Sequence, residues 1–310
     1  MNQNKIDQLS EGIGALLSES SNEASSHLDE MSPLEIATLM NEQDKLVAAA
    51  VQTQLFPISK AIEAAAEALA GNGRIIYVGA GTSGRLGILD ASECPPTFGV
   101  TPDRVVALIA GGPDAMFVAQ EGSEDCYAQG AQDLIDIQVT HKDVVIGLAV
   151  SGRTPYVLGA IEKANEFEAT TVAITCNERS ALEEVAAIGI TPIVGAEILT
   201  GSTRLKSGSA QKMVLNMIST GAMVQIGKCY GNRMVDLKAS NEKLQARALK
   251  LVREITKVDT AKAIMTLEAA EWNVKTSILM IKAVISAETA VKIIAENDGR
   301  LALAIEKLNL

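Results

Sequence analysis

The sequence predicts an α/β fold: a doubly wound, five-stranded parallel sheet covered by helices on both faces, followed by a small domain of helices only. Five short apolar runs alternate with helical sequence, and none of these runs alternates polar with apolar residues. Strands that are apolar throughout are typical of a parallel sheet buried on both sides. Aromatic residues make up only 3% of the chain, so aliphatic residues must fill the core, which suits helices packed on such a sheet.

The polar residues 1–46 are predicted to form an N-terminal arm and a first helix. Ser32-Pro33-Leu34-Glu35 supplies a cap and a proline in the first turn. A helical pattern then runs from Val47 to Leu69, and Gly71-Asn72-Gly73 ends it. We expect the arm to lie on the body of the protein or on a partner subunit.

Residues 47–235 are predicted to form the sheet domain, whose ligands should bind beyond the carboxyl ends of the strands. The long apolar helix Met213–Ile226 belongs to its core and is too short to span a bilayer. The predicted strands are Ile75–Val78, Val105–Ile109, Val144–Ala149, Thr171–Thr175 and Thr191–Val194.

Residues 236–310 are predicted to form a helical domain that serves packing or dimer formation. Amphipathic patterns separated by polar breaks recur in this part of the chain. The predicted helices are Leu244–Ile255, Thr260–Ala270, Asn273–Ile285 and Ala287–Ala295.

The charge balance argues against nucleic acid and membrane as partners. The chain has 27 Lys and Arg against 38 Asp and Glu, a net charge of -11, whereas nucleic acid and anionic lipid require clustered cations. The N-terminus lacks the basic start and apolar core of a signal peptide, so a cytoplasmic location is expected.

The cysteines and histidines indicate no metal site and no cofactor. Cys94, Cys126, Cys176 and Cys229 are far apart and form no Cys-x-x-Cys pair, so buried, reduced cysteines are expected. The chain has only two histidines, and their spacing is not that of metal ligands.

A glycine-rich loop follows the first predicted strand. Gly79, Gly81 and Gly84 match the dinucleotide fingerprint G-x-G-x-x-G. That fingerprint also needs an acid at the end of the second strand, but the sequence there is Ala110-Gly111-Gly112. A nucleotide cofactor is therefore the minor alternative.

A second loop, Ser151–Pro155, follows the third predicted strand. Thr154 could simply cap the helix that Pro155 begins. Two hydroxyl-rich loops from neighbouring strands would, however, converge on one point and form a phosphate site. The candidate phosphate ligands are Thr82, Ser83, Ser151, Gly152 and Thr154.

A third block, Gly195–Lys212, is rich in hydroxyls and precedes the long core helix. It reads equally well as a helix start capped by a serine and as a binding loop. In the second case Ser202, Arg204 and Lys206 would contact a substrate phosphate or carboxylate.

Two acidic positions are candidate proton donors or acceptors. Glu93 precedes Pro95-Pro96, which should end its helix, and Glu124 lies in the block Gln120–Asp125 together with Glu121. Taken alone, the first reads as a surface glutamate and the second as part of a helix start.

Together, Gly79–Pro96, Val150–Tyr156 and Gly195–Lys212 resemble the N-acetylmuramic acid 6-phosphate etherases of bacteria. These are sugar isomerase (SIS) domain proteins related to glucokinase regulatory protein. The resemblance extends from about Leu28 to the C-terminus through Asn41–Lys45 and Asn232–Asp236.

The resemblance implies a lyase that removes D-lactate from N-acetylmuramic acid 6-phosphate, by elimination and then hydration, in the recycling of cell-wall amino sugars. It assigns Glu93 as the acid that protonates the departing lactate and Glu124 as the residue that acts in the addition of water, with Glu121 a less favoured candidate for that role. The resemblance also implies phosphate binding by Ser83, Ser151 and Thr154, and a homodimer whose site is completed across subunits. The alternatives are a sugar-phosphate sensor, an aldose-ketose isomerase of the same fold and, last, a dinucleotide-dependent dehydrogenase.

Overall fold

The computed structural model describes residues 17–237, 239 and 241–309, so the first sixteen residues of the predicted arm lie outside the described part. The chain forms two compact units. The first comprises the chain up to Ala91 together with Val105–Ile218, and the second comprises Ser92–Arg104 with the chain from Ser219 onward. Each unit is described by itself.

The first unit contains the predicted five-stranded parallel sheet, with strand order β2-β1-β3-β4-β5. From β1 the chain moves outward to β2 and then returns to the other side of β1 as β3. This reversal creates a switch point at which the loops after β1 and β3 lie next to each other. The strands are β1 (Ile75–Gly79), β2 (Val105–Ile109), β3 (Val144–Leu148), β4 (Thr170–Ile174) and β5 (Ile188–Ile190).

The fifth strand was predicted at Thr191–Val194, which is wrong, because β5 ends at Ile190. The backbone carbonyl of Ile190 accepts from Thr175 N at 3.0 Å, but the N–H of Thr191 donates to the side chain of Gln54 instead of to a strand. A side chain that comes from the N-terminal helices therefore ends the strand.

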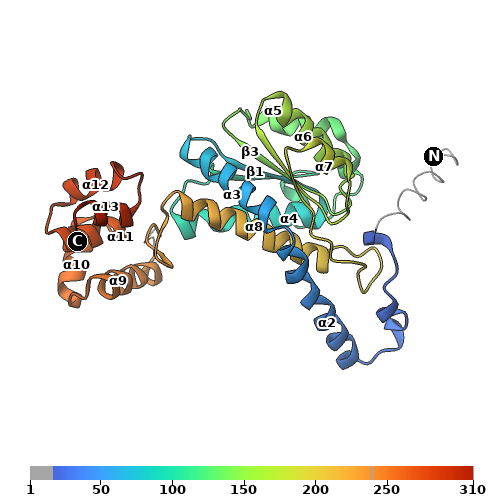
Figure 1. The fold of residues 1–310 in the computed structure, drawn as a ribbon, viewed down its shortest axis with the longest axis horizontal. Coiled ribbons are helices and arrows are strands. Elements are labelled where there is room, and N and C mark those ends of the chain that lie inside the picture. The colour runs from blue at the N-terminus through green and yellow to red at the C-terminus, as the bar shows by residue number, and fades with distance from the viewer. Residues whose placement is uncertain (1–16, 238, 240, 310) are drawn as a thin grey trace. The chain divides into compact units, whose positions relative to one another are not determined.

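Helices cover both faces of the sheet (Figure 1). Ile76 and Val78 of β1 pack toward α6, whereas Tyr77 points to the opposite face and donates to Asp90 of α4 at 2.8 Å. This alternation explains why the strands carry no polar side. One face carries α5 (Tyr127–Asp136), α6 (Pro155–Glu166) and α7 (Ala181–Val185), and the other carries α3 (Leu55–Ala70), α4 (Gly81–Phe98) and α8 (Lys206–Gln225).

Prolines act differently from the sequence prediction at two places. The pattern from Val47 to Leu69 is broken at Thr53 and Gln54 into α2 (Pro33–Gln52) and α3, because Pro57 has no N–H to continue the ladder. Conversely, α4 continues through Pro95 and Pro96 to Phe98. Gly99, in the left-handed region with φ +67°, ends it by donating to the carbonyl of Pro95.

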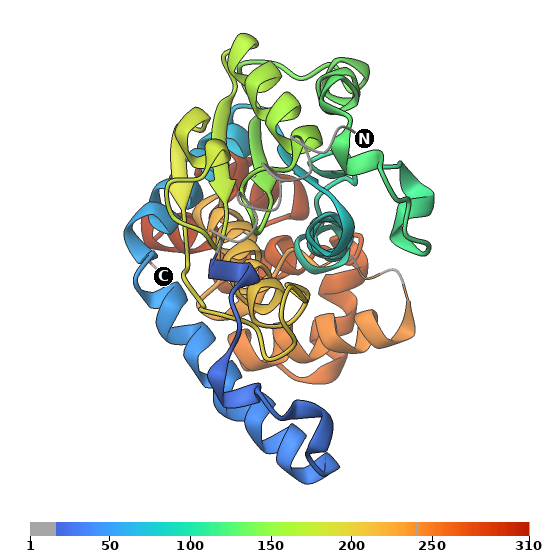
Figure 2. The ribbon, with the colours of Figure 1, turned by 90° about the vertical axis from the view of Figure 1, so that its right-hand side faces the viewer.

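The described part of the arm lies along α2 (Figures 1 and 2). Asn22 Nδ2 donates to Gln43 Oε1 and to the Ala196 carbonyl, each at 3.0 Å, and Ser18 N donates to Asn177 Oδ1 at 3.4 Å. The arm thus contacts the body of its own chain. It consists of three 3₁₀ turns, η1 (Leu17–Glu19), η2 (Glu23–Ser25) and η3 (Leu28–Glu30), and α2 then begins with the predicted cap, in which Ser32 and Glu35 form a capping box.

The second unit has its own helical core, with Lys275 Nζ donating to Asp236 Oδ2 at 2.6 Å. A two-stranded antiparallel hairpin, β6 (Cys229–Tyr230) with β7 (Arg233–Met234), precedes the helices and was not predicted, nor was the last helix. The helices are α9 (Glu242–Thr256), α10 (Thr260–Ala269), α11 (Val274–Ala283), α12 (Ala287–Ala295) and α13 (Leu301–Lys307).

Among the described residues, none of the helices is both long and apolar enough to cross a membrane. None of the four cysteines, all of which lie in the described part of the chain, forms a disulfide, but the prediction that all are buried is wrong, because Cys126 is exposed and Cys229 is half-buried.

An ion pair between the half-buried Arg74 and the buried Asp143 ties the start of β1 to the start of β3. Arg74 Nη2 lies 2.8 Å from Asp143 Oδ2, and the backbone N–H of Thr140 donates to the same oxygen at 2.9 Å. Burial raises the pKa of the Asp143 carboxyl, but the hydrogen bonds from Arg74 and Thr140 and the Arg74 charge outweigh this and lower it overall.

Asp143→Asn is expected to lower the free energy of unfolding at pH 7 by about 3 kcal/mol, because Arg74 loses its buried partner. Because its pKa is lowered in the folded state, the Asp143 carboxylate stabilises the folded protein at pH values above its unfolded pKa of about 3.9. That contribution is lost as the pH falls through the folded-state pKa. The deficit of the variant in urea unfolding should therefore shrink below about pH 4. Asp136→Asn, at an exposed carboxylate, is the control; a deficit independent of pH would contradict the prediction.

Candidate functional site

The loops after β1 and β3 meet at a cavity of about 580 Å³ in the first unit. Its wall includes the first turn of α4 and, from the second loop, Ser151 and Arg153–Pro155, so the two hydroxyl-rich loops do converge. Glu124 and Asp125 line the same cavity from a third segment. The candidate phosphate ligands and carboxylate side chains therefore share one space.

The three glycines of the first loop are explained by chain geometry. Gly81 adopts a left-handed conformation with φ +52° where β1 turns into α4. A Cβ on Gly84 would lie 2.9 Å from the Gly79 carbonyl oxygen and 2.6 Å from Ile109 Cγ1. The helix therefore begins very close to the strand, and its first N–H groups, which have no intrahelical acceptor, face the cavity.

The second loop leaves a hydroxyl for a ligand. Thr154 occupies the N-cap position of α6, yet its side chain makes no capping hydrogen bond to the described backbone and lines the cavity instead. Gly152 is a turn residue with φ +65°, where a Cβ would lie 2.2 Å from Ser180 Cβ. Its N–H already donates to the Ala149 carbonyl at 2.9 Å, so Gly152 shapes the loop and is not in the cavity wall.

The cavity combines groups that attract an anion with carboxylates, since Glu19, Glu124 and Asp125 line it beside Arg153. The N-termini of α4 and α6, helices of 18 and 12 residues, both border the cavity, and Arg153 lines it as well. Each N-terminus presents a partial positive charge and free N–H donors. Four of the five candidate phosphate ligands line this cavity, namely Thr82, Ser83, Ser151 and Thr154.

Ser83 is held by a buried glutamine. Its hydroxyl donates to Gln211 Oε1 at 2.8 Å, and Gln211, on α8, is fully buried. Among the described residues, Gln211 Nε2 has no hydrogen-bond partner.

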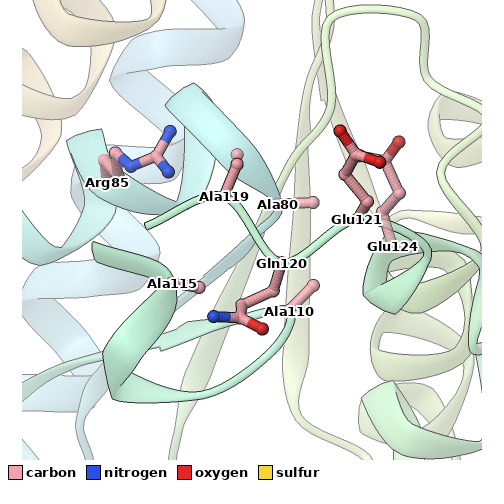
Figure 3. A pocket seen from close by; sticks show the side chains of 9 residues that line it. Ala80, Arg85, Ala110, Ala115, Ala119, Gln120, Glu121 and Glu124 are labelled. Atoms are coloured by element: carbon pink, nitrogen blue, oxygen red, sulfur yellow. The ribbon is translucent and has the colours of Figure 1, made fainter. Parts of the chain in front are cut away.

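Acidic side chains border the cavity on the side of the 3₁₀ turn η5 (Ser123–Asp125). Gly122, in the left-handed region with φ +79°, begins this turn and places Glu124 in the cavity wall. Glu124 and Glu121 also line a smaller cavity of about 190 Å³ with Arg85 of α4 (Figure 3). The two cavities share Ala80, Gly81 and Glu124, so they adjoin.

Glu93 is exposed and lies twelve residues beyond Gly81 on α4. It is not among the residues that line either of these two cavities. The sequence had suggested that Glu93 lies in the last turn of its helix. This is wrong, because α4 continues past the prolines to Phe98.

The third block serves mainly to begin α8. The buried carboxylate of Glu197 accepts from the backbone N–H groups of Lys206 and Ser207 at 3.0 and 2.9 Å. Lys206 Nζ donates to Gln43 Oε1 at 2.9 Å, and burial lowers its pKa, an effect that the charges of Glu197 and Asp44 oppose. Lys206 therefore holds α2 and is not among the residues that line the cavity.

Of the other predicted residues in this block, Arg204 is exposed and Ser202 half-buried, and neither lines the cavity, whereas Thr203 does. Sequence reasoning also missed two other groups of cavity residues. Ser18 and Glu19 come from the arm, where no motif marks them. Arg85 directly follows the first hydroxyl-rich loop and Arg153 lies within the second, and a cation at such a place could have been recognised as a candidate anion ligand.

Among the described residues, no group of three or more His, Cys, Asp or Glu side chains is arranged to hold a metal ion.

Comparison with known proteins places both units. Residues 57–165 match the glucokinase regulatory protein N-terminal SIS domain, residues 125–221 the SIS domain, and residues 231–297 the C-terminal lid domain of glucokinase regulatory protein. A solved phosphoheptose isomerase from Francisella tularensis is 14% identical, with a TM-score of 0.45, over 62% of this chain and 98% of its own.

Two curated relatives cover nearly the whole chain. The N-acetylmuramic acid 6-phosphate etherase of Vibrio atlanticus is 50% identical over 97% of this chain and 98% of its own length. The protein of the same name from an Enterobacter species is 53% identical over 95% of this chain and 99% of its own.

Proposed function

Because the chain belongs to the N-acetylmuramic acid 6-phosphate etherase family, we infer that it is a carbon–oxygen lyase that releases D-lactate from N-acetylmuramic acid 6-phosphate. The other product is N-acetylglucosamine 6-phosphate, so the reaction returns a cell-wall amino sugar to metabolism. The observation that carries this function is the cavity in which two hydroxyl-rich loops meet beside Glu124. A sugar phosphate fits such a site because it needs both an anion cradle and a proton-transfer group.

The chemistry consists of an elimination followed by a hydration. With the sugar ring open, a base removes the proton at C2, the C3–O bond breaks, and the lactate oxygen takes up a proton as it leaves. Water then adds its oxygen to C3 of the unsaturated aldehyde, and a proton returns to C2. One water is consumed for each ether cleaved, and positioned carboxylates can carry out such proton transfers.

The 6-phosphate is bound where the two helix N-termini border the cavity. Thr82, Ser83, Ser151 and Thr154 supply hydroxyl donors there, together with the first N–H groups of α4 and α6. Hydroxyls and amides carry no full charge, so they hold the phosphate while allowing the product to leave.

Glu124 acts in the addition of water, since it lines the cavity from η5. Glu93 protonates the departing lactate. It is not among the residues that line either cavity of its own chain, so we place it in the site of a second subunit. The functional form is a homodimer in the cytoplasm, with each site near the subunit interface.

The function is tested by incubating the purified protein with N-acetylmuramic acid 6-phosphate and measuring released D-lactate and N-acetylglucosamine 6-phosphate. Equal amounts of both products are expected. Binding of the substrate without any product would favour a sensor, and formation of a ketose phosphate would favour an isomerase; either result would refute the etherase.

A further inference from the structure

The substrate of the proposed reaction has two anionic groups, the phosphate at C6 and the lactyl carboxylate on the oxygen at C3. The two adjoining cavities contain one arginine each. Arg153 lines the larger cavity within the second hydroxyl-rich loop, and Arg85 lines the smaller one. The arginines thus match the two anions in number and stand in separate parts of the site.

We propose that the smaller cavity is the subsite for the lactyl group, with Arg85 pairing with its carboxylate; this assignment rests on the proposed function. The guanidinium has donors to spare, because its Nε donates to the Met116 carbonyl at 3.0 Å and no salt bridge joins Arg85 to a carboxylate of the described residues. A guanidinium fork suits a carboxylate because it can donate two parallel hydrogen bonds.

The size and lining of the smaller cavity also fit a lactyl group. Its volume of about 190 Å³ would hold about six water molecules at roughly 30 Å³ each, enough for a three-carbon acid. Figure 3 shows Ala119 and Ala80 between Arg85 and the two glutamates, and Ala115 and Ala110 beside Gln120. These four alanines offer an apolar surface to the lactyl methyl group.

This position places the scissile bond next to a proton-transfer group. Glu124 lines both cavities, so a sugar in the larger cavity with its lactyl group in the smaller one has its C3–O bond beside that carboxylate. The cations of the third block do not compete for this role, since Lys206 is bonded to Gln43 and Arg204 is not in the wall of either cavity.

The test compares two ligands that differ only in the lactyl group. Arg85→Gln should weaken binding of N-acetylmuramic acid 6-phosphate about tenfold or more, as expected for a lost hydrogen-bonded charge pair, while binding of N-acetylglucosamine 6-phosphate stays unchanged. The affinity of Arg85→Lys for N-acetylmuramic acid 6-phosphate should lie between those of Arg85→Gln and the wild type. Arg253→Gln, an exposed arginine on α9, is the matched control and should change neither affinity.

Ala119→Leu gives a second, independent variant, because Ala119 is exposed and filling the cavity there leaves the core intact. It should also weaken only the lactyl ligand. The subsite would be overturned if Arg85→Gln and Ala119→Leu weakened binding of both ligands equally, or changed the binding of neither. If wild-type protein releases no lactate at all, the proposed function fails instead, so the two failures are distinguishable.

A second feature points to a residue that positions Ser83. The Ser83 hydroxyl gives its proton to Gln211 Oε1, while Gln211 Nε2, fully buried, has no partner among the described residues. Rotating the amide by 180° in the same volume would make Nε2 the donor to Ser83 Oγ. The Ser83 proton would then be free for a phosphate oxygen.

The geometry points to Gln211 as a positioning residue whose amide turns when phosphate binds. Both orientations leave one amide atom without a partner, but an unpaired carbonyl oxygen is tolerated better than an unpaired N–H. The turned orientation therefore also relieves the buried Nε2. A glutamine can serve both states because it donates and accepts from nearly the same position.

Gln211→Glu removes the donor, so Ser83 must give its proton to the new carboxylate. KM for the sugar phosphate at pH 8 is expected to rise about tenfold or more, since one hydrogen bond to a charged group is lost, with kcat changed less. A buried carboxyl has a raised pKa, so lowering the pH toward 6 should protonate it and recover part of the loss relative to wild type at each pH.

Gln211→Leu separates this role from simple packing, because it leaves the Ser83 proton free. Its KM should rise less than that of Gln211→Glu and should follow the pH dependence of the wild type. Equal KM values for the two variants, with no recovery at lower pH, would reduce Gln211 to a structural residue and overturn the assignment.

Discussion

Replacing Glu93 with Gln is expected to lower kcat for lactate release by about 10² to 10⁴-fold, the usual contribution of a general acid. Gln has nearly the same shape but cannot transfer a proton to the departing oxygen. The side chain is exposed, so folding and substrate affinity should be little changed. The measurement is steady-state D-lactate release alongside a thermal unfolding curve. Glu67→Gln, at an exposed glutamate on α3, is the matched control.

Mixed dimers decide which subunit uses Glu93. If it acts across the interface, combining Glu93→Gln and Glu124→Gln subunits puts both defects into one site of a mixed dimer and leaves the other site intact. A random one-to-one mixture should then recover about a quarter of wild-type activity. If both glutamates act within one chain, every site in the mixed dimer carries one defect and no activity returns. Near-normal turnover by Glu93→Gln alone would remove it from the acid role.

The second large effect is expected for Glu124→Gln, with a different signature. Turnover to N-acetylglucosamine 6-phosphate should fall by about 10² to 10⁴-fold because water is no longer activated. Elimination does not require this group, so about one equivalent of lactate should appear per site, together with an unsaturated aldehyde that absorbs in the ultraviolet. Rapid-mixing absorbance and product analysis would follow both.

Glu121→Gln is the matched control for this variant, because Glu121 lines only the smaller cavity whereas Glu124 lines both. We expect a smaller loss of activity and no accumulation of the unsaturated sugar. If Glu121→Gln accumulates the intermediate and Glu124→Gln does not, the two roles must be exchanged.

Much of the first unit could be read from the sequence because its signals are local. A strand that is apolar throughout, such as Ile75–Gly79, announces a buried parallel sheet without any knowledge of its neighbours. The loops after β1 and β3 were recognisable because glycine and hydroxyl residues directly follow such strands. That they meet then followed from the general order of doubly wound sheets, not from any contact visible in the sequence.

The errors occurred where distant side chains decide the local structure. Ser83 and Gln211 are separated by 128 residues, and Glu197 caps α8 from nine residues before the helix begins, so neither interaction has a sequence signature. Lys206 was a candidate ligand for an anion because it stands with Arg204 in a block rich in hydroxyls, which could equally be a helix start. Its hydrogen bond to Gln43, 163 residues away, explains its position.

By itself, the sequence determined the fold class, the two hydroxyl-rich loops and, through the resemblance of long blocks, the candidate glutamates. These depend on periodicity and on chemistry carried by consecutive residues. Only the tertiary structure decided that Gly152 shapes its loop, that the cations of the third block stand apart from the cavity, and that Arg85 enters a cavity with Glu124. The physical reason is that hydrogen-bond partners and burial are set by chain segments that meet only after folding.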